Sequence, residues 1–260
     1  MFRPLFVFWV SIYSYPRQMF DTLFNSLLTL VYPQQCRICG NSVEKSADGA
    51  ACSECWEKVR LYGKRELKCR KCGAYLGQSD NDGFGAQCGR CEHHFYDKAW
   101  AAGVYEHGLA AAIIQLKSDP YISPRCRLLL LKTFSQINDD ENSVLVPVPL
   151  SEKRMLERGY NQAEVLARYI SAETRTPLRI DVLIRKQHTL MHRAAMDERG
   201  REMTVEKAFD VTRKRAVRDA QIILVDDVLT SGSTVSTCAK VLKKSGAKRV
   251  DVLTLARAVQ

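Results

Sequence analysis

The sequence predicts an α/β protein with a parallel β-sheet covered by helices on both faces, preceded by a cysteine-rich metal-binding module. Two observations support this prediction. Strand and helix patterns alternate from about residue 99 to residue 260, and such alternation is typical of parallel sheets. Eight of the 10 cysteines fall between Cys36 and Cys91 as four Cys-x-x-Cys pairs, and this spacing is typical of zinc sites.

The composition is that of a packed globular protein. The 260 residues are 46% apolar and 26% charged, with 14 Gly and 8 Pro, which excludes disordered, collagen-like and low-complexity proteins. We divide the chain into an apolar amino-terminal segment (1–31), a zinc module (32–98) and an α/β domain (99–260). The apolar run from Leu5 to Val10 is too short to cross a membrane, which needs about 20 residues.

The amino-terminal segment carries apolar residues at helical spacing: Met19, Phe20, Leu23, Phe24, Leu27, Leu28 and Val31. This stripe predicts a helix that packs on the zinc module, with a membrane-surface or partner helix as the alternative. No clear cleavage site follows the apolar run, so a signal peptide is disfavoured. A zinc–thiolate module favours a reducing compartment, and we expect a cytoplasmic protein. Met19 is an alternative start of the chain.

The clustered cysteines form the pairs Cys36/Cys39, Cys52/Cys55, Cys69/Cys72 and Cys88/Cys91. Two residues between cysteines let both sulfurs of a tight turn face one ion, and two such turns complete a tetrahedral site. Four pairs therefore predict two structural zinc ions. The gaps favour ligation by consecutive pairs, with interleaved pairs as the alternative.

A disulfide framework is the other interpretation of an even number of cysteines, but it is typical of secreted domains without a large core. We expect the α/β domain to fold without the metal, because its hydrophobic core is predicted not to depend on the zinc ions. Cys126 and Cys238 stand alone in helical patterns, and we expect both to be small buried apolar residues.

The α/β domain is predicted from its alternating elements in chain order. We expect strands over 99–105, 144–148, 222–225 and 250–255, and helices over 109–117, 126–134, 162–170 and 233–244. Gly246 is expected to end the last helix, and the charged stretch 185–207 has no regular pattern. Ligands in such folds bind at the carboxyl ends of the strands.

One such strand end has an unusual sequence. Residues 222–225 run into Asp226 and Asp227, and then into a hydroxyl-rich turn at a helix start, Thr230, Ser231, Gly232, Ser233 and Thr234. Unpaired N–H groups and the helix dipole favour an anion there, so we expect this turn to bind one phosphate. Adjacent carboxylates suit sugar hydroxyls or a divalent cation. Walker and dinucleotide-binding loops are excluded because their glycine motifs are missing, so a phosphorylated sugar is the expected ligand.

The run IILVDDVLTSGST, from Ile222 to Thr234, resembles the 5-phosphoribosyl-1-pyrophosphate (PRPP) motif of type I phosphoribosyltransferases. With the four cysteine pairs and the runs 146–150 and 158–162, it makes the chain similar to the ComF family. Members of that family have a double zinc ribbon followed by a phosphoribosyltransferase domain. The resemblance covers residues 32–260, includes Lys117 in a family-like Leu-Lys element, and implies a link to natural competence and DNA uptake.

The resemblance also implies roles for individual residues. It assigns Asp226 and Asp227 to the ribose hydroxyls and the turn 230–234 to the 5-phosphate. It places three cations, Lys153, Arg154 and Arg158, where this superfamily binds pyrophosphate with Mg²⁺. A cation at that place stabilises the departing pyrophosphate more than the substrate, so Arg158 joins the two acids as a candidate catalytic residue.

The chain departs from the family pattern in the segment 185–207. Thr204 stands about where relatives have Asn, and His188 and His192 are spaced like ligands on one helix face. Without a third ligand nearby, we expect both histidines to be polar surface residues. This segment is expected to help cover the pocket of the nucleophile, so the sequence leaves the acceptor substrate open.

Two classes of function fit the sequence. The first is an enzyme that displaces pyrophosphate from PRPP with a nitrogen nucleophile. The second is a binding protein in DNA uptake that uses a phosphoribosyl site for a nucleotide or for single-stranded DNA, with Lys153 and Arg154 as the first candidates for DNA contact. Residues 99–260 have 26 basic and 19 acidic residues, which favours a polyanion, but no aromatic series interleaves these charges.

Overall fold

The computed structural model describes residues 34–63, 66–78, 87–137, 142–186 and 208–259. The predicted amino-terminal helix with Met19, and the segment that holds His188, His192 and Thr204, lie outside these residues. Among the described residues, no helix combines the length and the apolar character that crossing a membrane would require.

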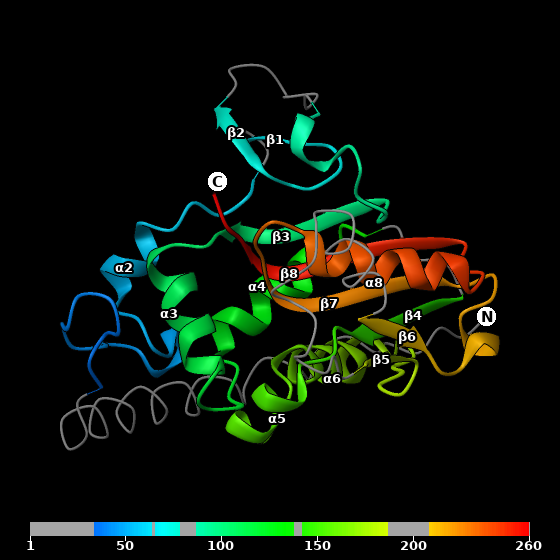
Figure 1. The fold of residues 1–260 in the computed structure, drawn as a ribbon. Helices are drawn as coiled ribbons and strands as arrows, with labels where there is room; N and C mark the ends of the chain where they lie inside the picture. Colours follow the sequence, from blue (N-terminus) through cyan, green and yellow to red (C-terminus); the bar gives the residue numbers. More distant parts are fainter. Residues whose placement is uncertain (1–33, 64–65, 79–86, 138–141, 187–207, 260) are drawn as a thin grey trace, which may run out of the picture.

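A four-stranded sheet forms the centre of the α/β part (Figure 1). Its strands stand in the order β3 (Lys98–Val104), β8 (Arg249–Arg257), β7 (Gln221–Leu229) and β4 (Ser143–Pro147), and all neighbours are parallel. Val225 of β7 pairs with Leu253 of β8 on one side and with Pro147 of β4 on the other. The carboxyl ends of the strands therefore meet at one edge, and the predicted parallel α/β fold is confirmed.

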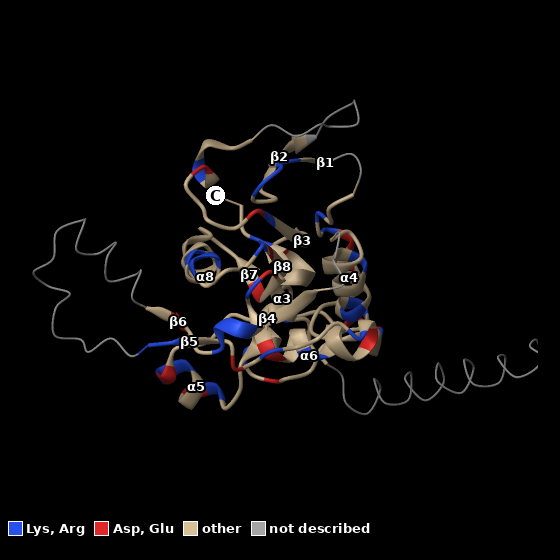
Figure 2. Ribbon diagram, turned by 90° about the vertical axis from the view of Figure 1, so that its right-hand side faces the viewer, with Lys and Arg blue, Asp and Glu red and all other residues tan. Residues whose placement is uncertain are grey.

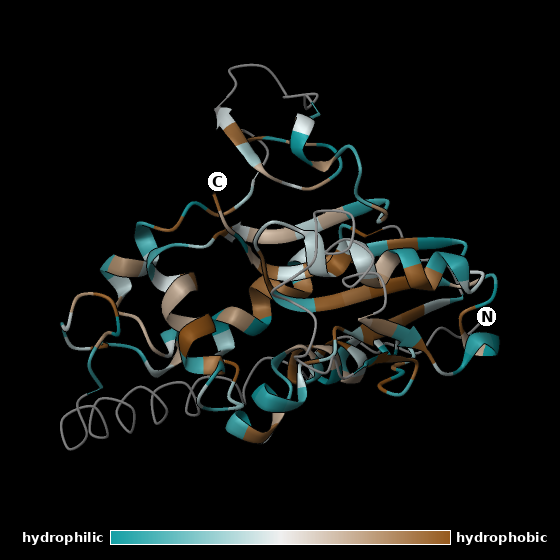
Figure 3. Ribbon diagram, in the orientation of Figure 1, coloured by the Kyte–Doolittle hydropathy of each residue, from teal (hydrophilic) through white to brown (hydrophobic). Residues whose placement is uncertain are grey.

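Helices bury both faces of this sheet, as the nearly continuous apolar strands predict (Figure 3). One face is covered by α3 (His107–Leu116), α4 (Pro124–Phe134) and α6 (Gln162–Thr174), and the other by α8 (Ser233–Lys244). Side chains of β7 alternate between the two layers. Ile223 and Val225 pack with the first group of helices, and Ile222 and Leu224 pack with α8.

Several short elements are not predicted by the sequence patterns. They are α5 (Glu152–Arg158), the antiparallel pair β1 (Glu66–Lys68) and β2 (Tyr75–Gln78), the antiparallel pair β5 (Leu183–Arg185) and β6 (Phe209–Val211), and the 3₁₀ helices η1 (Ser46–Asp48), η2 (Gly89–Cys91) and η4 (Lys214–Ala216). α5 begins where the Ser151 hydroxyl accepts a hydrogen bond from the Arg154 N–H (3.4 Å) and ends at Gly159, which has a φ of +77°. Strands of three or four residues are too short to show a reliable alternation.

The cysteine-rich modules share their core with the sheet. Trp56, in α2 (Ser53–Glu57), is buried in one cluster with Cys55, with Ile113 of α3 and with Leu253 of β8. A Cβ atom added at Gly108 would lie 2.5 Å from Cδ2 of Trp56, so only glycine allows α3 to approach the indole this closely. The α/β core and the first cysteine module therefore share buried apolar contacts, which argues against the expectation that the α/β domain folds without the metal.

Candidate functional site

The structure gathers the eight clustered cysteines into two tetrads, each with its sulfurs within 4.8 Å of one another. The first tetrad holds Cys36, Cys39, Cys52 and Cys55, and the second holds Cys69, Cys72, Cys88 and Cys91. All eight thiols are free, and their sulfurs are grouped by consecutive pairs, as the gaps in the sequence favour, with no disulfide among them. The Sγ–Sγ distance is 3.6 Å for Cys39 and Cys52 and 3.5 Å for Cys69 and Cys91, close to the ~3.8 Å edge of a tetrahedron with Zn–S bonds of ~2.3 Å.

Backbone donors in the tetrads stabilise the thiolate form that binds zinc. Burial disfavours the Cys36 thiolate, but backbone N–H groups outweigh this effect and lower the pKa of Cys36 to about 6. The same balance lowers the pKa of Cys69 to about 6. The N–H groups of Ile38 and Cys88 donate to the sulfurs of Cys36 (3.5 Å) and Cys69 (3.3 Å), respectively. Both tetrads therefore fit structural zinc.

The acid pair lies within β7 rather than beyond its end. Asp227 is 9% exposed, and its N–H donates to Oδ1 of Asp226 at 2.9 Å. The prediction that both acids stand at a solvent-facing strand end is wrong for Asp227, because β7 and its pairing with β8 continue to Leu229. Burial raises the pKa of both carboxyls, and the neighbouring Asp227 helps to raise the pKa of Asp226 to about 8.

Two cations from separate helices act on the acid pair. Lys117, directly after α3, opposes the rise in pKa of both acids, and Arg158, the last residue of α5, opposes the rise at Asp227. The guanidinium of Arg158 donates to Oε1 of Gln162 at 2.8 Å. The structure thus brings Arg158 to the acids as the sequence predicts, and it adds Lys117 as a residue of the site.

Hydrogen bonds made by Tyr160 and Asn161 connect the elements that carry these cations. The Tyr160 hydroxyl donates to the carbonyl of Leu116 at 2.8 Å, which ties the end of α3 to the segment after α5. The Asn161 amide donates to the carbonyl of Val148 at 3.0 Å, and its oxygen caps α6 by accepting from the Ala163 N–H at 3.1 Å. The run 158–162 therefore joins β4, α3 and α6 around the site.

Lys153 and Arg154 are less involved in the site than Arg158. Both are exposed on α5, which lies at the lower edge of the ribbon (Figure 2). The ammonium of Lys153 lies 3.9 Å from Oε1 of Glu157 on the same helix. The leading causes of the pKa shifts of the acid pair include Lys117 and Arg158 but neither Lys153 nor Arg154.

The predicted phosphate turn forms the start of α8. Gly232 precedes the helix in a left-handed conformation with a φ of +85° and caps it with no side chain. The Ser233 N–H donates to the hydroxyl of Ser231 at 3.3 Å. The hydroxyl oxygens of Ser231 and Ser233 lie 3.0 Å apart. Thr230 and Thr234 are also exposed. The start of α8 therefore presents hydroxyl groups and helix N–H groups, which is the arrangement that binds a phosphate.

Arg257, the last residue of β8, holds the beginning of this turn. Its Nη1 donates to the carbonyls of Leu229 (2.7 Å) and Thr230. The side chain is buried, with an exposed fraction of 5%, and among the described residues no acid pairs with it. The turn has no basic side chain of its own, and Arg257 brings a cation to it through the hydrogen bond to the Thr230 carbonyl. No local pattern indicates Arg257 in advance, because this residue lies outside the motif.

Replacing Asp226 by asparagine is expected to stabilise the ligand-free protein at pH 8. The pKa of Asp226 is raised to about 8 in the folded protein, so between about pH 4 and pH 8 the folded chain holds a proton that the unfolded chain releases. The free energy of unfolding therefore falls as pH rises through this window. Because Asp226 is half-buried and thus partly screened, we expect a gain of about 2 kcal/mol at pH 8 and none at pH 4.

Urea unfolding at several pH values measures this difference. Asp210→Asn is the control, because its exposed carboxylate pairs with Lys186 at 2.6 Å and its pKa is lowered. That substitution should give no gain at pH 8. A stability difference for Asp226→Asn that does not change between pH 4 and pH 8 would contradict the assignment.

Two family models match the chain in the order of its two parts. A double zinc ribbon domain matches residues 27–92, and a phosphoribosyl transferase domain matches residues 125–260, which is just over half of the chain. The second match contains α5, the acid pair, the phosphate turn and Arg257. The first contains all eight tetrad cysteines.

Two named relatives match this chain over nearly their whole length, and a third matches over about half of its length. Competence protein F of Haemophilus influenzae is 29% identical over 235 residues, 86% of this chain and 97% of that protein. DNA utilization protein YhgH of Escherichia coli is 28% identical over 240 residues, 88% of this chain and 99% of that protein. Competence protein ComFC of Bacillus subtilis is 36% identical over 126 residues, 48% of this chain and 49% of that protein. The chain therefore belongs to the phosphoribosyl transferase domain family, as a ComF-type member with an amino-terminal double zinc ribbon.

Proposed function

We propose that the chain binds PRPP, or a nucleoside 5′-monophosphate, at the carboxyl end of β7. One juxtaposition carries this proposal: two carboxylates are followed, after two residues, by a hydroxyl-rich turn that leads into the N-terminus of α8 and presents hydroxyl and N–H groups. The ribose hydroxyls donate to Asp226 and Asp227, and the 5-phosphate accepts from the turn 230–234. Few ligands other than a ribose 5-phosphate group need sugar acceptors and phosphate donors side by side.

The cations beside the acids support pyrophosphate as the second ligand group. Arg158 and Lys117 act on Asp227 from two helices, and their charge complements the pyrophosphate that departs from ribose C1. In a transfer reaction, the bond from C1 to the pyrophosphate oxygen breaks while a nitrogen nucleophile bonds to C1. Pyrophosphate leaves with Mg²⁺, and the nucleophile loses a proton to solvent.

Calorimetry with Mg²⁺–PRPP, ribose 5-phosphate and Mg²⁺–pyrophosphate tests the binding proposal. We expect PRPP to bind most tightly, because it alone engages the turn, the acids and the cations together. Failure of all three ligands to bind would overturn the proposal. Pyrophosphate release from PRPP, measured with a panel of amines and bases, then separates a phosphoribosyltransferase from a binding protein.

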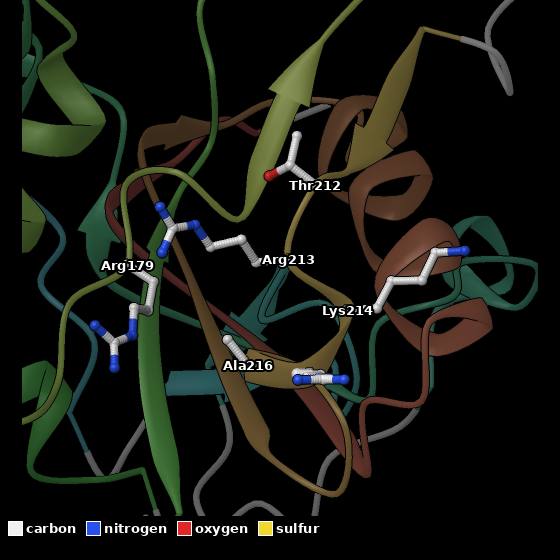
Figure 4. A pocket seen from close by; sticks show the side chains of 6 residues that line it. Arg179, Thr212, Arg213, Lys214 and Ala216 are labelled. Atoms are coloured by element: carbon white, nitrogen blue, oxygen red, sulfur yellow. The ribbon is translucent and has the colours of Figure 1, made fainter.

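A basic groove supports single-stranded DNA as a second ligand. The groove has a volume of about 650 Å³ and is lined by Arg179, Thr212, Arg213, Lys214, Arg215 and Ala216 (Figure 4). Arg213 pairs with Asp181 at 2.6 Å, whereas Arg179, Lys214 and Arg215 form no ion pair within the part of the chain that the structure covers. Uncompensated cations in a groove suit a phosphate backbone, and one relative is named DNA utilization protein YhgH.

Neutralising Arg179 and Arg215 together is expected to reduce the salt dependence of DNA binding. Each phosphate contact that is lost flattens the log–log slope by about 0.7 for a single strand, so the slope should change by about 1–2 units. This slope is measured by titrating a fluorescent single-stranded DNA with the protein at several salt concentrations. Lys243→Ala is the control, because Lys243 is already paired with Asp97 at 2.7 Å. The same series with Lys153 and Arg154 neutralised should change the slope less, and an unchanged slope in the groove variant would place the DNA site elsewhere.

A further inference from the structure

The segment that leaves the second cysteine tetrad lies along one face of α8. The Phe95 N–H donates to the Ser236 hydroxyl at 3.1 Å, and the Lys240 ammonium lies 4.6 Å from the centre of the Phe95 ring. At the other end of the helix, the Lys243 ammonium contacts Oδ1 of Asp97 at 2.7 Å. Residues 236, 240 and 243 lie on one face at helical spacing. Residues 95–97 therefore contact α8 from its first turn to its last.

At the start of α8 this segment reaches the phosphate turn itself. A Cβ atom added at Gly232 would lie 2.7 Å from Cε1 of His94, 3.1 Å from its Nδ1 and 3.3 Å from the hydroxyl of Tyr96. Gly232 also has a φ of +85°, which other residues rarely adopt. The turn therefore needs glycine for two reasons, and the second reason is the contact with His94. A larger residue at 232 would therefore meet the zinc ribbon.

The second tetrad fixes the position of His94. The His94 N–H donates to the carbonyl of Cys91 at 3.1 Å, and the His94 carbonyl accepts from the Lys71 ammonium at 2.6 Å. The imidazole Nδ1 lies 2.7 Å from the hydroxyl of Tyr96, a residue that is only 1% exposed. Lys71 lies between two ligand cysteines of the first knuckle, and Cys91 belongs to the second. Both knuckles of this tetrad thus hold one imidazole against the turn.

We propose that His94 is a positioning residue of the phosphate turn, through which the second zinc module forms part of the phosphoribosyl site. The imidazole packs on the backbone at Gly232 and restricts the turn to the conformation in which its N–H groups converge. A preorganised turn loses less freedom when phosphate binds, so removing the imidazole weakens the ligand without touching it. The inference rests on the proposed phosphoribosyl function.

A double-mutant cycle between residues 94 and 232 tests this proposal with the full-length protein and Mg²⁺–PRPP. We expect His94→Ala to weaken PRPP about tenfold by loss of preorganisation. Gly232→Ala should weaken it about 100-fold, because strain at the positive φ and the clash with His94 add together. The double variant should bind more tightly than Gly232→Ala alone, since the methyl group occupies the space that the imidazole leaves.

Gly246→Ala at the opposite end of α8 is the matched control. Gly246 has a φ of +99°, and an added Cβ atom would approach no atom closer than 3.6 Å. This variant carries the strain of the positive φ without a clash, so its PRPP affinity should equal that of the wild type. Combining it with His94→Ala should give no more than the effect of His94→Ala alone.

Two further measurements separate positioning from general damage. Elemental analysis should find unchanged zinc in every variant, because none removes a ligand cysteine. Tyr96→Phe, which removes only the hydroxyl beside Nδ1 of His94, should weaken PRPP about threefold by freeing the imidazole, and this variant remains informative if Gly232→Ala does not fold. If the wild-type protein binds PRPP and the affinity losses of His94→Ala and Gly232→Ala simply add in the double variant, the inference is wrong but the proposed function stands. No binding by the wild-type protein would overturn the proposed function and the inference with it.

Discussion

Replacing Asp226 and Asp227 together by asparagine is expected to weaken the binding of Mg²⁺–PRPP by about 100-fold or more. In the proposed complex each carboxylate accepts a hydrogen bond from a ribose hydroxyl, and a hydrogen bond to a charged group contributes about 1.5–3 kcal/mol. Losing two such bonds removes about 3 kcal/mol or more, and each 1.4 kcal/mol is about tenfold in affinity. Calorimetry at pH 8 measures the change.

Loss of the fold would not account for such a result. Asparagine at position 226 is expected to stabilise the ligand-free protein at this pH, because it removes a carboxylate that burial keeps at a raised pKa. Asp210→Asn, on β6 in an exposed ion pair with Lys186, should bind PRPP like the wild type. Equal affinity of the wild type and the Asp226/Asp227 double variant would show that the acid pair does not bind ribose.

Replacing Cys36 by serine is expected to remove about one of two zinc ions and to destabilise the whole chain. Zinc binding contributes about 10–16 kcal/mol in small zinc modules, which equals or exceeds the about 5–15 kcal/mol that stabilises a typical protein. Cys36 and Cys55 lie in one buried cluster with Ile113 and Leu253. The α/β part therefore loses core contacts when the first tetrad opens.

Elemental analysis and denaturant unfolding measure these two effects together. Cys126→Ala is the control, because Cys126 is a buried thiol of α4 outside both tetrads. It should retain two zinc ions and lose only modest stability. A zinc-free wild-type protein with its eight clustered cysteines in disulfides would contradict the metal assignment. An unchanged unfolding transition in the Cys36→Ser variant would contradict the shared core.

The elements with strong local patterns could be predicted from the sequence. The helix expected over 233–244 is α8 with the same limits, because a glycine precedes it, apolar residues recur at helical spacing and Gly246 follows it. The strand expected over 222–225 is longer, since β7 continues through the acid pair to Leu229. The order of the strands could not be read from such patterns, because it depends on contacts between distant parts of the chain.

Some residues of the site could likewise be predicted from the sequence, and others could not. The acids and the phosphate turn form one continuous motif, and the structure places them together at one strand end. Lys117, Arg257 and His94 reach that place from α3, from β8 and from the exit of the zinc ribbon. Only tertiary packing brings these three residues to the motif, so local spacing could not assign them to the site.

A crystal structure of the protein with PRPP and Mg²⁺ tests the phosphoribosyl site most directly. We expect the 5-phosphate against the N–H groups of residues 232–234 and the ribose hydroxyls within hydrogen-bond distance of Asp226 and Asp227. The pyrophosphate should lie beside Lys117 and Arg158. PRPP bound elsewhere, with no phosphate at the start of α8, would contradict the account.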